Sequence, residues 1–262
     1  MAVVFADAQS YARTDSLLTG AFSFCAWVYR TSDNTVDNVV LWGHNAGFTS
    51  YTAIARNASN RCVIFDSTTA YSAPTSPEFS TNAWYFIAWA QPAASNGQVW
   101  IWDTSGTMGT ASDGAVRPLA DNTILELGAS FSTGGLIGRA AGVKLWNAVL
   151  TEAEFVNEMR SLRPRRTSNL YLWSPFLNGA DTVDHSGNGR SWTAAGSPTS
   201  GDGPPVGWGA PPLVVPSLSQ IWQYGRPISD VAKGSWTAST GSDLYAMIDE
   251  EGVSDADYIR SP

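Results

Sequence analysis

The sequence predicts an all-β protein, an antiparallel β-sandwich of jelly-roll type with one short helix and an extended C-terminal arm. Runs of β-favouring residues recur about every ten residues between Gly, Pro, Asn and Ser, which is typical of a sandwich. The composition agrees, because the 262 residues include 12 Trp, 24 Gly and 14 Pro while only 15% are charged. So many aromatic side chains also argue against a largely disordered chain.

The strand pattern is clearest in two of the expected strands. Residues 21–29 alternate two sets that are both fairly apolar, which indicates a central strand covered on both faces. In residues 97–103, Val99 and Ile101 alternate with Trp100 and Trp102. The expected strands are residues 2–5, 21–29, 38–42, 51–55, 61–66, 83–91, 97–103, 123–127, 136–147 and 170–176.

One helix is expected over residues 151–162. Thr151 and Glu154 have the spacing of a capping box, and Pro164 ends the helix. Three apolar residues then fall on one helical face at Phe155, Met159 and Leu162. Four arginines follow closely: Arg160, Arg163, Arg165 and Arg166. They fit a helix C-terminus, where the dipole favours cations, and alternatively an anionic partner surface.

The composition divides the chain into three parts. Residues 1–195 form the sandwich, and residues 196–220 are rich in Pro and Gly and are expected to be a linker or strap. Residues 221–262 form an acidic C-terminal arm or partial module. The arm has 42 residues and no disulfide or metal site, which is near the lower limit for a segment that folds alone. It is therefore expected to pair with another chain, to pack on the first domain, or to stay unpacked.

Several functional classes are excluded by charge and hydropathy. The net charge of −8 argues against nucleic-acid binding, which needs a positive footprint. No run of 18 apolar residues is present, so no membrane span is expected, and the N-terminal residues lack a secretory signal pattern. Two cysteines make no disulfide framework; buried free thiols at Cys25 and Cys62 are expected, with a bridge between them as the alternative.

Three motifs resemble laminin-G-like, concanavalin A-like jelly-roll domains. They are FSFCAWV at residues 22–28, GRAAGVKLWNAVLTEAE at residues 138–154, and the turn DHSGNG at residues 184–189. They occur in a plausible order across residues 22–189 and imply the fold. Function has to be argued from a site, because this fold hosts lectins, glycosidases, adhesive modules and viral structural proteins.

The C-terminal arm resembles a different group, the C-terminal modules of tailed-bacteriophage virion proteins. The residues that carry the resemblance are RPISDV at 226–231, GSWT at 234–237, IDE at 248–250 and DADYI at 255–259. In those proteins the segment begins a longer β-domain, whereas this sequence stops at Pro262. The resemblance implies an extended arm, or a partial module completed by a neighbour.

No catalytic constellation is evident in the sequence, so no enzyme activity is expected. A retaining glycosidase needs two carboxylates about 5–5.5 Å apart, and Glu126 is a solitary strand carboxylate. The histidines, His44 and His185, are expected in turns rather than in a triad. The sequence has no zinc-ligand cluster.

Two binding sites remain as candidates. Calcium is a candidate ion at Asp181, Asp184 and Asn188 because it prefers carboxylate and amide oxygens; the alternative is that these side chains cap their own turn. A second calcium set is Asp33, Asp37 and Asn38. Trp100 and Trp102 share a strand face and form a sugar platform if that face is solvated; the alternative is packing.

The sequence favours a non-enzymatic bacteriophage virion protein, a capsid decoration or a tail or fibre component, made in the host cytoplasm. It is expected to assemble with itself and with other virion proteins. The arm supplies the expected partner contacts, by strand addition and aromatic anchoring. The alternatives are a carbohydrate-binding adhesion module for host surface glycans and a glycoside hydrolase. The expected contact residues are Trp222, Tyr224, Trp236, Leu244, Tyr245, Ile248 and Tyr258.

Overall fold

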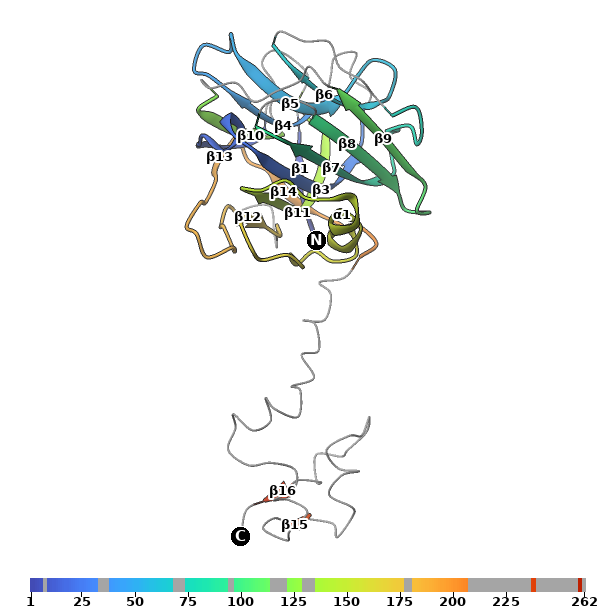
Figure 1. The fold of residues 1–262 in the computed structure, drawn as a ribbon, viewed down its shortest axis with the longest axis vertical. Coiled ribbons are helices and arrows are strands. Elements are labelled where there is room, and N and C mark those ends of the chain that lie inside the picture. Colours follow the sequence, from blue (N-terminus) through green and yellow to red (C-terminus); the bar gives the residue numbers. More distant parts are fainter. Residues whose placement is uncertain are drawn as a thin grey trace. The chain divides into compact units, whose positions relative to one another are not determined.

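Figure 1 shows the fold in a computed structural model of the chain. The structure describes residues 1–6, 9–32, 38–67, 74–93, 97–113, 122–128, 135–176 and 181–206, and the two short strands at 237–238 and 259–260. The chain divides into two compact units, Met1–Gly209 and Ala210–Pro262.

Two antiparallel sheets build the first unit, as the sequence predicts (Figure 1). In chain order, the larger sheet contains β1 (Ala2–Phe5), β3 (Phe22–Arg30), β7 (Trp84–Gln91), β8 (Gly97–Asp103), β9 (Met108–Asp113), β11 (Gly138–Trp146), β12 (Leu170–Ser174) and β14 (Thr199–Gly201). Its spatial order is β14-β1-β11-β3-β7-β8-β9, and β12 also pairs with β11.

The second sheet has the order β13-β2-β10-β4-β5-β6. Its strands are β2 (Ser10–Thr14), β4 (Asn38–His44), β5 (Tyr51–Arg56), β6 (Cys62–Asp66), β10 (Ile124–Leu127) and β13 (Thr193–Ala195). A short 3-10 helix covers Leu17–Thr19, and α1 (Glu152–Met159) is the α-helix of the described residues. No described helix has the length and apolar character needed to cross a membrane.

All ten expected strands are confirmed within a few residues. The strands β2, β9, β13 and β14 were not predicted from the sequence. They are short or rich in Ser, Thr and Gly and therefore lack a strong apolar alternation. β14 also corrects the domain boundary expected at residue 195. It pairs with β1, so part of the expected linker is the edge strand of the larger sheet.

The main core lies between the two sheets. Phe22, Phe24, Ala26 and Val28 of β3 point into it, and the buried side chains of β4, β5, β6 and β10 meet them from the other sheet. A second apolar cluster covers the outer face of the larger sheet, where Cys25 and Trp27 of the same strand point toward α1. Strand β3 is therefore covered on both faces, as its sequence predicts.

A β-bulge in β11 decides which of its side chains face α1. The register with β3 shifts between Ala141 and Lys144, and Gly142 has a left-handed φ of +58°. The extra residue reverses the alternation. Val143 and Leu145 join the main core, while Lys144 and Trp146 face outward with α1.

Both cysteines are buried and free. Cys25 lies in the outer cluster under α1, and Cys62 lies in the main core between the sheets. Burial raises the pKa of each thiol far above its ordinary value, so neither is a reactive nucleophile at neutral pH.

In the second unit the structure describes one antiparallel strand pair. Strand β15 (Thr237–Ala238) pairs with β16 (Ile259–Arg260), Thr237 opposite Arg260 and Ala238 opposite Ile259. The pairing joins two segments of the expected C-terminal arm that are distant in sequence.

Replacing Gly142 with Ala should destabilise the first unit. A side chain at a left-handed φ costs about 1–2 kcal/mol, and an added Cβ would lie 2.9 Å from Leu162 Cδ2. Urea unfolding measures the loss. Gly20→Ala is the matched control, because Gly20 has a φ of −125° and nothing within 4 Å of its added Cβ. Equal stability of the two variants would contradict the role given to the bulge.

Candidate functional site

An open groove of about 800 Å³ is formed by three segments on the outer face of the larger sheet. One segment is the loop after α1, the second is strand β12, and the third is the turn at residues 184–189. The lining side chains are Arg163, Pro164, Thr167, Leu170, Trp173, His185, Ser186 and Asn188.

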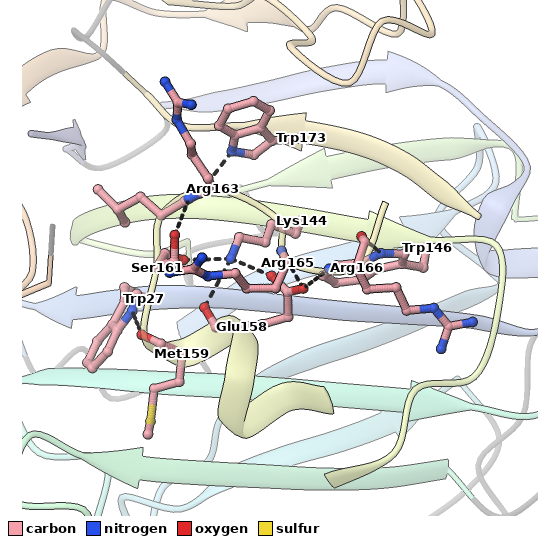
Figure 2. A network of polar contacts seen from close by, with 11 residues as sticks. Trp27, Lys144, Trp146, Glu158, Met159, Ser161, Arg163, Arg165, Arg166 and Trp173 are labelled. Atoms are coloured by element: carbon pink, nitrogen blue, oxygen red, sulfur yellow. Dashed lines mark hydrogen bonds and ion pairs between the residues drawn. The ribbon is translucent and has the colours of Figure 1, made fainter. Parts of the chain in front are cut away.

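The loop after α1 is held by a buried ion pair, shown in Figure 2. Lys144 Nζ lies 2.7 Å from Glu158 Oε2, and both side chains are 1% exposed. The ammonium also donates to the backbone carbonyls of Glu158 at 3.0 Å and Ser161 at 2.7 Å, so its three donors are all used.

The second carboxylate oxygen of Glu158 binds the same loop. Oε1 accepts hydrogen bonds from the backbone N–H groups of Arg165 at 2.8 Å and Arg166 at 2.7 Å. Trp27 and Trp146 donate their indole N–H groups to the carbonyls of Met159 and Arg166. These partners satisfy the polar backbone that follows a helix end and fix the course of the loop.

The expected capping box of α1 is confirmed. The Thr151 hydroxyl accepts from Glu154 N–H, and the Glu154 carboxylate accepts from Thr151 N–H and also pairs with Arg166. Burial disfavours the charged form of Glu154, but these hydrogen bonds outweigh that effect and lower its pKa. The helix ends at Met159 rather than at residue 162. The Ser161 N–H donates to the Glu158 carbonyl three residues back, a tighter turn than an α-helix makes, and Lys144 and Trp27 donate to the Glu158 and Met159 carbonyls.

Trp173 forms the aromatic wall of the groove. In the sheet register it lies opposite Lys144, so its side chain faces the same side as α1. Its indole N–H donates to the Leu162 carbonyl at 3.0 Å, which fixes the ring, and the ring remains half-buried rather than covered. The His185 imidazole meets it edge-on at 5.8 Å between centroids.

The turn at residues 184–189 is organised by the Asp184 carboxylate. It accepts from the backbone N–H groups of Trp173, Ser186 and Arg190 and from the Ser186 hydroxyl. Burial disfavours the charged form of Asp184, but these hydrogen bonds outweigh it and lower its pKa. The side-chain amide of Asn188 donates to the carbonyls of Leu170 and Tyr171.

These contacts correct the calcium site expected at Asp181, Asp184 and Asn188. The Asp184 oxygens already accept from N–H and O–H donors, and Asn188 directs its N–H₂ group to two carbonyl oxygens; both are turn chemistry rather than cation coordination. Across the described ranges, no group of three or more His, Cys, Asp or Glu side chains could hold a metal ion. Asp33 and Asp37 of the second calcium set lie outside those ranges, and of Asn38 only the backbone is described.

The sugar platform expected at Trp100 and Trp102 is also corrected. Each side chain is 3% exposed, so neither offers a free ring face. Trp100 packs against Phe155 of α1 at 5.2 Å and donates its indole N–H to Glu152, and Trp102 packs against Phe86 at 5.7 Å. Both side chains therefore serve in packing, which was the alternative interpretation of their pattern.

His44 is the last residue of β4 and is 2% exposed, rather than a turn residue as expected. Its Nδ1 lies 2.8 Å from the Asn45 carbonyl, and its Nε2 lies 3.4 Å from Glu126 Oε2. Trp42 donates its indole N–H to the same Glu126 oxygen, and Phe48 stacks on His44 at 4.6 Å between centroids. His185 does lie in a turn, as expected.

The seven contact residues expected in the C-terminal arm lie outside the described residues, so their role stays a prediction. They are Trp222, Tyr224, Trp236, Leu244, Tyr245, Ile248 and Tyr258. Among the groove residues, Arg163 and the 184–189 turn were noted in the sequence, but Trp173 was not. The available signal was that the arginine-rich segment and the DHSGNG turn flank one expected strand, 170–176.

No protein-family model matches the chain, and no curated protein matches it. Solved structures resemble its fold, at low identity. They include the enzymatically active domain of bacteriophage CBA120 tailspike protein 2 (TM-score 0.48, 15% identity, 64% of this chain, 28% of that chain). A second is the LG1-3 region of the laminin alpha2 chain (TM-score 0.44, 6% identity, 55% of this chain, 30% of that chain). A third is the SAP-like pentraxin of Limulus polyphemus (TM-score 0.46, 8% identity, 73% of this chain, 90% of that chain). All three contain jelly-roll-like β-sandwiches, and the chain spans less than a third of the tailspike and laminin chains.

Replacing Lys144 with Met should lower the free energy of unfolding by about 3–5 kcal/mol, because it leaves the Glu158 carboxylate buried without its cation. The double variant Lys144→Met/Glu158→Gln should lose less than the single one, since Gln keeps an acceptor for Arg165 and Arg166 without the buried charge. Urea unfolding measures both. A double variant no more stable than Lys144→Met would contradict this account.

Replacing Asp184 with Asn should destabilise the fold by about 1.5–3 kcal/mol at pH 7, the range for hydrogen bonds to a charged group. Because the folded pKa of Asp184 is lowered, its contribution is complete above the unfolded pKa, about 3.9, and is lost as pH falls through the folded value. The difference between wild type and variant should therefore shrink toward pH 3. Urea unfolding at pH 7, 5 and 3 measures it, and a constant difference would refute the assignment.

Proposed function

We propose that the β-sandwich is a non-catalytic carbohydrate-binding module whose site is the groove around Trp173. The observation that carries the proposal is the half-buried indole of Trp173, fixed by its hydrogen bond, in a groove lined mainly by polar side chains. A sugar ring has apolar C–H faces and a polar rim. It therefore suits a site with one aromatic wall and a few placed hydrogen-bonding groups.

The polar lining fits this use. Thr167 and Asn188 are exposed and offer a hydroxyl and an amide oxygen, and His185 offers a ring nitrogen from a side chain that is 30% exposed. The backbone under these groups is held by the Asp184 hydrogen bonds on one side and the Lys144–Glu158 pair on the other. A site with its backbone already fixed loses little conformational entropy on binding.

A binding role, rather than hydrolysis, is supported by the composition of the groove. Among the described residues that line it there is no Asp or Glu, whereas glycosidases generally use two carboxylates that flank the scissile bond. The acids nearest the turn, Asp181 and Asp184, are buried and hold the turn's own backbone.

A place in a bacteriophage virion is part of the proposal, supported by the resemblance of the C-terminal arm to virion proteins. In that setting the sandwich binds host surface glycans and the arm attaches it to the particle. Shortening the chain after Gly209, the end of the first compact unit, should keep glycan binding and abolish incorporation into particles. Unchanged incorporation would count against the arm.

Replacing Trp173 with Ala should abolish or weaken glycan binding at least tenfold, because the stacking surface is lost, whereas Trp173→Phe should keep part of it. A glycan array identifies ligands, and calorimetry measures their Kd. Trp84→Ala is the matched control, since Trp84 is also half-buried but does not line the groove. Equal losses in the two alanine variants, or no binding by the wild type to any glycan, would refute the proposed function.

A further inference from the structure

We propose that the ligand of this groove is an acidic oligosaccharide, whose acid group is bound by Arg163 while its ring stacks on Trp173. This inference rests on the proposed function and adds the ligand class to it. Arg163 and Trp173 line the same groove, and Figure 2 shows the two side chains close to each other above the Lys144–Glu158 pair.

The charge of this surface differs in sign from that of the whole chain. The chain carries a net charge of −8, yet Arg163, which lines the groove, and Arg165, two residues along the same loop, are both exposed. Two acids of α1 are paired within the fold, Glu158 with Lys144 and Glu154 with Arg166. The local field therefore favours an anion and raises the rate of its encounter with the site.

The Asp184 carboxylate of the turn is largely buried and accepts from the turn's own N–H groups rather than facing the opening. Two other charged groups lie near the groove. Asp181 lies with its Oδ1 3.4 Å from His185 Nε2 and is largely buried, so it faces the histidine rather than the opening. The Arg190 guanidinium stacks on Tyr171 at 3.9 Å and donates to the Tyr171 carbonyl. Neither places an exposed negative charge among the lining residues.

Arg163 has the chemistry that a carboxylate or sulfate group requires. A guanidinium is planar, always charged, and presents paired N–H donors that match two oxygens of one acid group. The backbone N–H of Arg163 donates to Ser161 Oγ at 3.0 Å, and the Ser161 carbonyl accepts from Lys144, so the root of the side chain is fixed by the buried pair. The fold thereby fixes the backbone of this exposed arginine in the same groove as the fixed indole.

This arrangement also gives the arginine-rich segment a role that a helix dipole does not. The last turn of α1 contains no basic residue, and Arg160 is its C-cap. Arg163 and Arg165 are exposed in the loop beyond the helix end, where the effect of the dipole has faded. Of the two readings of the sequence, the anionic partner surface accounts for these two residues.

The test compares ligands that differ only in charge. Oligogalacturonate is the carboxylated probe, its methyl ester is the neutral control of the same size, and a heparin oligosaccharide is the sulfated probe. The full chain should bind at least one of the two acidic probes at least tenfold more tightly than the methyl ester, with an affinity that falls as salt rises. Which acidic probe binds identifies the acid group.

Arg163→Gln should reduce affinity for the acidic probe at least tenfold and leave the weak affinity for the methyl ester unchanged. Arg61→Gln is the control: it removes the same charge from a residue that does not line the groove. Arg163→Lys keeps the charge without the paired donors and should bind with intermediate affinity. Thermal unfolding of all variants checks that the sandwich is intact, and the exposure of Arg163 predicts no large loss.

The outcomes separate this inference from the proposed function. Equal binding of oligogalacturonate and its methyl ester, or equal losses in Arg163→Gln and Arg61→Gln, would overturn the acidic ligand while leaving carbohydrate binding in place. No binding of any saccharide would overturn both. Tight binding of a single-stranded oligonucleotide in preference to every saccharide would also overturn both, since stacking and arginine contacts are equally the chemistry of that ligand.

Discussion

The buried ion pair between Lys144 and Glu158 is the constraint on which this side of the molecule depends. Two charges at 1% exposure are costly unless every donor and acceptor is used. Here the ammonium makes three hydrogen bonds, and the second carboxylate oxygen accepts two more from the following loop. These hydrogen bonds fix the backbone conformation of residues 158–166, and this segment forms one side of the groove.

The tryptophans extend the same logic to the backbone of that segment. Trp27, Trp146 and Trp173 come from three different strands, and each donates its indole N–H to a carbonyl between Met159 and Arg166. Each ring also adds apolar packing surface on the outer face of the larger sheet, which lies outside the main core. The high tryptophan content thus reflects two tasks, filling the outer cluster and holding a loop that lacks regular structure.

The strands with strong apolar alternation could be predicted from the sequence, as could the capping box, because both signals are local. The groove could not, because it depends on which strands pair. In the sequence, Trp173 looks like any other aromatic residue of a strand. Only the strand pairing, which puts it opposite Lys144, shows that it faces the same side as α1. Trp100 and Trp102 carry the same local pattern and are covered by the helix and its neighbours. Exposure, which distinguishes a binding aromatic from a packing one, is a property of the tertiary arrangement.

The bulge at Gly142 has an evolutionary consequence. Because one extra residue reverses the alternation of β11, removing it would turn Lys144 toward the interior of the sandwich and Leu145 toward the helix. Substitutions along this strand can accumulate one at a time, but a change of its length by one residue exchanges two entire side-chain rows at once. Insertions and deletions in relatives of this chain should therefore spare β11 and fall in the connections between strands.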